Sequence, residues 1–293
     1  MPTTFAFDDI RADFAEFKTI LSDFLRGVPA DSDKWNTRTG TRDKDWTVHQ
    51  VLAHMVAIAE AFNYSARCAM SGEEIITEGM FKRENLREWN NSQIARLFRH
   101  TPSGLSNMLL AKLDISIHIL NEMTPESAQK TAFLPVYNRP ARAIDFIDWQ
   151  LSHAGIIHAS HIKRAFDNQP HWEQYSPALT HRQIDRFVRH FSVAYWADYA
   201  PDVNTVINFH IEGASGGDWH IIMRPDGGSS GVGKIEDAEY AITFDSPQTF
   251  FSAFTVHVPM LELVTSGAMT VHSDPQKTLT LLRLFSATPP KKG

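Results

Sequence analysis

The sequence predicts a multidomain protein in which an all-α four-helix bundle is followed by an α+β domain. At 293 residues the chain is longer than one typical domain of about 150 residues. Apolar residues recur at helical spacing in the first part of the chain and alternate as in strands further on. Because Pro170 and Pro177 end the helical pattern, we place the two domains at residues 1–172 and 178–293.

Composition and charge exclude several classes of protein. Lys plus Arg is 28 and Asp plus Glu is 34, so the net charge is −6, and without a basic patch we expect no nucleic-acid partner. The single cysteine, Cys68, cannot form an internal disulfide, which is typical of a reducing compartment. Neither a signal peptide nor an apolar run of about 18 residues is present. We therefore expect a cytoplasmic protein without a membrane span, and a homodimer is compatible with the sequence.

Four helices are expected in the N-terminal domain. Their ranges are Phe5 to about Leu25, Trp46 up to the connection that begins at Ser71, Gln93 or Leu105 to Glu122, and about Ala141 to Asp167. The second has the most complete start signal, because Thr47 fits the N-cap and Gln50 completes a capping box. His54 shares the apolar face of this helix and is therefore expected to point into the core. The segment from Met123 to Pro140 is expected to be a loop.

The last of these helices carries three histidines within nine positions, His153, His158 and His161. At about 100° per residue, His158 falls on the apolar stripe of an α-helix and His161 at its edge. His153 falls on the opposite side, so we expect it to face outward. Histidine is the most common metal ligand and titrates near neutral pH, so the cluster is a candidate site.

The C-terminal domain is expected to hold a sheet with helices on one side. Expected helices are Thr180–Tyr199, Pro247–Thr255 and Pro275–Phe285, and expected strands are Val203–Ile211, Asp218–Arg224, Tyr240–Phe244 and Ala268–His272. Alternation of apolar and polar residues predicts the first of these strands. The glycine-rich stretch Pro225–Gly233 is expected to be a loop.

Two stretches of the N-terminal domain resemble the DinB-like bundles, most closely the mycothiol-dependent maleylpyruvate isomerases. They are Asp45–His54 and Ile157–Phe166. Residues from about 180 to 285 look like a sterol-carrier-protein-type domain, with the match over Ile207–Gly213, Gly216–Ile222, Ala238–Phe254 and Gly267–Phe285. The two resemblances together cover nearly the whole chain, and the isomerase has a similar carrier-like C-terminal half.

The resemblance implies a metal site with one altered ligand. The family histidines that bind the metal correspond to His54 and His158. One turn before the second of them the family has a histidine or a glutamate, and Ala154 stands there in this chain. His161 is the substitute that we expect, because residues three apart on a helix share a face. A site of His54, His158 and His161 would leave a divalent metal, most simply zinc, an open fourth position.

Two functions follow from these observations. The first is a metal-dependent enzyme similar to thiol-dependent isomerases or transferases, with a low-molecular-weight thiol such as mycothiol and a small electrophilic substrate. A bound thiol or water would be the nucleophile. The alternative is a non-enzymatic carrier for an apolar, lipid-like ligand with a metal-less bundle, in which His54 is an ordinary core histidine and His161 contacts water, Asp43 or Asp45.

Overall fold

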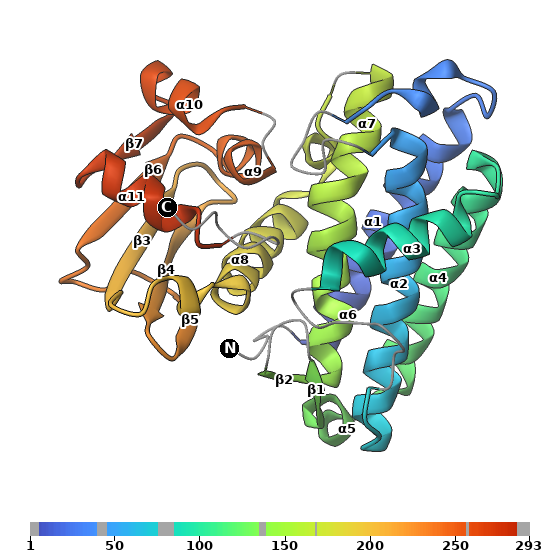
Figure 1. Cartoon of the computed structure of the whole chain (residues 1–293), viewed down its shortest axis with the longest axis horizontal. Coiled ribbons are helices and arrows are strands. Elements are labelled where there is room, and N and C mark those ends of the chain that lie inside the picture. The colour runs from blue at the N-terminus through green and yellow to red at the C-terminus, as the bar shows by residue number, and fades with distance from the viewer. Residues whose placement is uncertain are drawn as a thin grey trace. The chain divides into compact units, whose positions relative to one another are not determined.

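Figure 1 shows the computed structural model of the chain, which describes residues 6–39, 46–75, 85–134, 139–167, 169–255 and 258–285. Two compact units meet in sequence between Tyr175 and Ser176. The predicted order, a helical region followed by a region with a mixed sheet, is confirmed. Within the described ranges, no helix has the length and apolar character that a membrane span needs.

The N-terminal unit is built from long helices packed around α2. Its elements are α1 (Phe7–Gly27), η1 (Asp33–Asn36), α2 (Val48–Ser71), α3 (Leu86–Leu97), α4 (Pro102–Glu122), α5 (Pro125–Gln129), β1 (Thr131–Leu134), β2 (Arg139–Arg142), α6 (Ala143–Ser152), η4 (His153–His158), α7 (Ala159–Asp167) and η5 (His171–Gln174). α2 contacts α3, α4, α6 and α7, and α1 contacts α4 and α6. The long helices run side by side in Figure 1, and α2 is buried over most of its circumference.

The start of α2 follows the sequence prediction. The Gln50 N–H donates to Thr47 Oγ1 at 3.3 Å, and the Thr47 N–H donates to Gln50 Oε1 at 2.8 Å, which confirms the capping box. The helix runs to Ser71 and ends at Gly72, whose φ of 81° lies in the left-handed region that glycine adopts without strain. His54 lies in the second turn of α2 and is buried.

Two stretches that were expected to be loops form regular structure. The first, between Met123 and Pro140, contains the short helix α5 and the antiparallel pair β1 and β2. Alternate residues of β1 are buried, but its sequence does not alternate between polar and apolar residues, because the apolar Phe133 is exposed. The second contains β5, which pairs with β4. All residues of β5 except Val232 are glycine or serine.

The C-terminal unit is a five-stranded mixed sheet with helices. Its elements are α8 (Pro177–Ala194), η6 (Ala197–Tyr199), β3 (Thr205–Ile211), β4 (Gly217–Arg224), β5 (Gly227–Val232), β6 (Tyr240–Phe244), α9 (Pro247–Thr255), α10 (Met260–Ser266), β7 (Met269–Val271) and α11 (Pro275–Leu282). The strand order is β5-β4-β3-β6-β7, with β3 and β6 parallel and the other pairs antiparallel. α8 packs on β4 and β5, and α9 contacts β6 and α8. Phe209, Phe244 and Phe250 are fully buried between these layers.

Close packing of β5 on α8 depends on Gly228. A Cβ at this position would lie 2.5 Å from the carbonyl oxygen of Ser192 in α8, which is too close for any real contact. Gly228→Ala is therefore expected to lower the free energy of unfolding of this unit by about 1–3 kcal/mol, as for other overpacked sites. Urea unfolding checks this, with Ser229→Ala on the opposite face of the strand as the control. Equal midpoints for the two variants would contradict it.

Candidate metal centre

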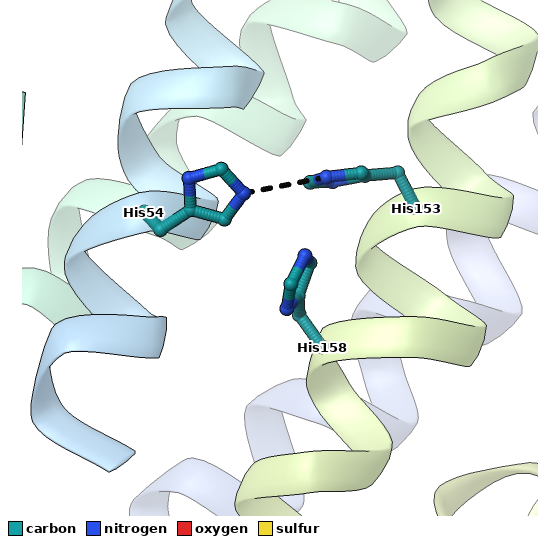
Figure 2. A group of neighbouring side chains, drawn as sticks. All are labelled: His54, His153 and His158. Carbon is teal, nitrogen blue, oxygen red and sulfur yellow. Dashed lines mark hydrogen bonds between the residues drawn. The ribbon is translucent and has the colours of Figure 1, made fainter. Parts of the chain in front are cut away.

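Three histidines from two neighbouring elements converge inside the N-terminal unit (Figure 2). His54 comes from α2, whereas His153 and His158 open and close η4, a π-helical turn of six residues between α6 and α7. Each ring can offer one nitrogen, and the three nitrogens all lie within 4.8 Å of one another. Among the described residues, no other group of three or more His, Cys, Asp or Glu side chains meets this condition.

The rings are in mutual contact. His54 Nε2 lies 3.4 Å from His153 Nε2, and the ring centroids of His153 and His158 are 4.5 Å apart. The His54 and His158 centroids are 4.8 Å apart. His54 and His158 are buried, with exposed fractions of 4% and 3%, whereas His153 is half-buried. His153 is therefore the most exposed of the three side chains.

The position of His153 corrects the sequence interpretation, which had it facing outward. That interpretation assumed an α-helix throughout, in which residues five apart differ by about 140° around the axis. In the π-helical turn the backbone bonds run over five residues, as between the Ala159 N–H and the Ala154 carbonyl, so residues five apart lie over one another. The spacing of five between His153 and His158 was the signal in the sequence that could have found it.

His161, the third ligand expected from the sequence, lies next to this group but is not a member of it. Its ring centroid is 5.5 Å from that of His158, and the side chain is 4% exposed. Ala154 is also buried, at 2% exposed, and offers no donor atom. His49, one turn earlier on α2, contacts the His100 carbonyl through Nε2 at 2.9 Å and stands apart from the cluster.

Burial keeps the imidazoles of His54 and His158 neutral. Desolvation lowers the pKa of His54 to about 3. It also lowers the pKa of His158 well below its usual value, and the charged forms of His153, His54 and His161 add to this effect. A neutral imidazole has a free lone pair on one nitrogen and is the form that binds a metal. At neutral pH the cluster is therefore ready to coordinate a cation.

The separation of two ring nitrogens fits a divalent metal. Two nitrogens bound to one tetrahedral zinc at about 2.0–2.1 Å lie roughly 3.3 Å apart. The measured separation of His54 Nε2 and His153 Nε2 is 3.4 Å. In addition, Nδ1 of His54 and Nδ1 of His158 are buried without a hydrogen-bond partner among the described residues. A metal bound through Nε2 of His54 would not supply a partner for its Nδ1, so the fit rests on the separation of the Nε2 atoms.

Aromatic side chains hold the histidines in place. The Trp46 ring lies 4.7 Å from the His54 ring, and the Phe62 ring lies 6.2 Å from that of His153. Both aromatic residues are half-buried. They restrict the orientations of the imidazoles by packing and leave little room for water around them, which strengthens electrostatic interactions within the cluster.

Known proteins resemble the chain in structure rather than in sequence. No model of a known protein family matches it, and no curated protein does. A crystal structure of the mycothiol-dependent maleylpyruvate isomerase matches with a TM-score of 0.54 at 13% sequence identity, covering 86% of this chain and 90% of that one. The chain shares the fold of this isomerase. A histidine-to-alanine mutant of the isomerase matches with a TM-score of 0.52 at 12% identity and the same coverage.

Proposed function

We propose that the chain is a metal-dependent enzyme of the kind represented by thiol-dependent isomerases and transferases. The single observation that carries the proposal is the convergence of His54, His153 and His158 within one fold shared with the isomerase. The proposal includes the finer assignments, a DinB-like four-helix bundle and a sterol-carrier-type C-terminal unit. Zinc, a low-molecular-weight thiol such as mycothiol, and a small electrophilic substrate complete it.

His54 and His158 are two of the ligands in this proposal, because the family resemblance implies both and both lie in the histidine cluster. The third is His161, as the sequence suggests, or His153, whose nitrogen lies nearer to the other two. A bound divalent ion with an open position would lower the pKa of a thiol or water and give a nucleophile at neutral pH. The side chains of Trp46 and Phe62 orient the histidines and limit the access of water.

The charges around the cluster favour an anionic ligand such as a thiolate. Every charge that shifts the pKa of His158 belongs to a histidine, and no carboxylate, which would raise this pKa, is among the causes. Three neutral imidazoles leave the double positive charge of a divalent ion uncompensated. Since opposite charges attract strongly in a buried, water-poor environment, an anion is the preferred additional ligand. A thiolate fits this requirement and matches the cofactor in the name of the isomerase.

Thiol binding to the metal-loaded protein tests the proposal. The protein is loaded with Co²⁺ and titrated with mycothiol, and absorption in the near ultraviolet reports a thiolate bound to the metal. We expect a new band with mycothiol and none with its S-methyl derivative, which cannot form a thiolate. Equal spectra for both compounds would contradict the thiol part of the proposal. A fatty acyl compound in an organic extract of the metal-free protein would favour the carrier alternative.

A further inference from the structure

The π-helical turn η4 lies at the centre of the proposed site. It separates α6 from α7, and both of its ends are histidines of the cluster. In such a turn each backbone bond spans one residue more than in an α-helix. Turns of this kind are rare, occur mostly as single turns within α-helices and are frequent at functional sites.

The additional residue changes which side chain lies over His158. In an α-helix the residue one turn before His158 would be Ala154, which offers no donor. In the π-helical turn it is His153, whose ring centroid lies 4.5 Å from that of His158 and 5.2 Å from that of His54. Figure 2 shows the His153 and His158 rings directed toward the same space next to His54.

We infer that the π-helical turn supplies the third metal ligand, because its one extra residue moves His153 into the position that Ala154 would hold in an α-helix. This inference rests on the proposed function and makes it more specific. It assigns His153 rather than His161 as the third ligand. The altered spacing therefore preserves a set of three protein donors, as catalytic zinc requires.

A hydrogen bond from outside the helix stabilises this turn. The Tyr175 hydroxyl donates to the Gly155 carbonyl at 2.6 Å, and the contact is buried. A wider turn disturbs the regular pairing of backbone carbonyls, and an unpaired buried carbonyl costs about 1–3 kcal/mol. Tyr175 is thus a positioning residue for His153 and His158, which it does not need to touch.

Zinc affinity, measured by competition with a chromogenic chelator, tests the inference without any activity assay. His153→Ala is expected to weaken binding by more than about 100-fold, because groups behind the ligands alone contribute 10–100-fold. His161→Ala, the matched control in the adjoining helix α7, is expected to keep a zinc affinity near that of the wild-type protein. Tyr175→Phe is expected to weaken zinc binding less than His153→Ala does. It is also expected to change the Co²⁺ absorption spectrum less than the loss of a ligand would.

Deletion of Ala154 tests the role of the extra residue itself. It would place His153 four residues before the next histidine, and residues four apart share a face of an α-helix. We expect zinc binding to survive this deletion, with circular dichroism as the check of folding. A folded deletion variant that loses zinc would overturn the account of the turn, and the two histidine variants decide the ligand even if the deletion prevents folding.

The outcomes separate the inference from the function on which it rests. If His161→Ala loses zinc and His153→Ala keeps it, the inference is wrong, while a metal-dependent function remains supported. If the wild-type protein binds no zinc at all, the proposed function fails together with the inference. Loss of zinc in His153→Ala alone supports both.

Discussion

Replacement of both His54 and His158 by alanine is expected to reduce bound zinc from about one ion per chain to none. These two residues come from different helices, and the geometry and the family resemblance both point to them. With both removed, at most two imidazoles would remain near the site, which is fewer than a stable zinc site contains. Elemental analysis of protein purified without added metal checks this.

The control for this experiment is His49→Ala. His49 lies on the same helix as His54, but its Nε2 contacts the His100 carbonyl and its ring packs on Phe98. This variant is expected to keep its zinc. Full occupancy in the double variant, or equal loss in the control, would contradict the assignment, because the metal would then be bound elsewhere.

The second large effect is a loss of stability in mild acid in the metal-free protein. Burial lowers the pKa of both His54 and His171 to about 3 in the folded chain. In the unfolded chain both groups take up a proton near pH 6.5. As the pH falls below 6.5, the unfolded state therefore binds more protons than the folded state and is favoured. Above pH 6.5 both states are neutral at these positions and the full stability is present.

The size of this effect follows from the two pKa shifts. Each buried histidine lowers the free energy of unfolding by about 1.4 kcal/mol per pH unit, or roughly 3 kcal/mol for the pair between pH 6.5 and 5. That is a large part of the 5–15 kcal/mol typical of a folded protein. Urea unfolding in the presence of a chelator at pH 7, 6 and 5, followed by the helical signal, measures it.

His171→Phe isolates one of the two contributions. The His171 ring packs edge-on against Phe17, Phe24 and Tyr175, so an aromatic replacement keeps the packing and removes the titrating group. The pH dependence is expected to fall by the contribution of His171, about 1.4 kcal/mol per pH unit below pH 6.5. An unchanged dependence would mean that His171 is protonated in the folded chain, contrary to the effect of its burial.

Much of the fold could be predicted from local patterns. The capping box at Thr47 and Gln50 is confirmed, as is the alternation that buries Ile207, Phe209 and Ile211 in β3. These features depend on residues within one turn or one strand. The short pair β1 and β2 and the glycine-rich β5 were missed, because their side chains are too few or too small to produce a clear pattern of apolar residues.

The candidate site was predictable only in part. His54 and His158 were placed in the interior by helical phase and by resemblance, and both are buried in the structure. His153 was expected on the wrong side, because one extra residue in a helical turn rotates every side chain that precedes it relative to those that follow. Helical phase assumes a constant rotation per residue, so it cannot detect such a turn. Only the spacing of five between two histidines hinted at it.

Anomalous scattering at the zinc edge from crystals of the zinc-loaded protein tests the three-histidine site most directly. The predicted result is a single peak at about 2.0–2.1 Å from ring nitrogens of His54, His153 and His158, with the π-helical turn intact. A peak bound by His161 in place of His153, or no peak beside His54 and His158, would contradict the site.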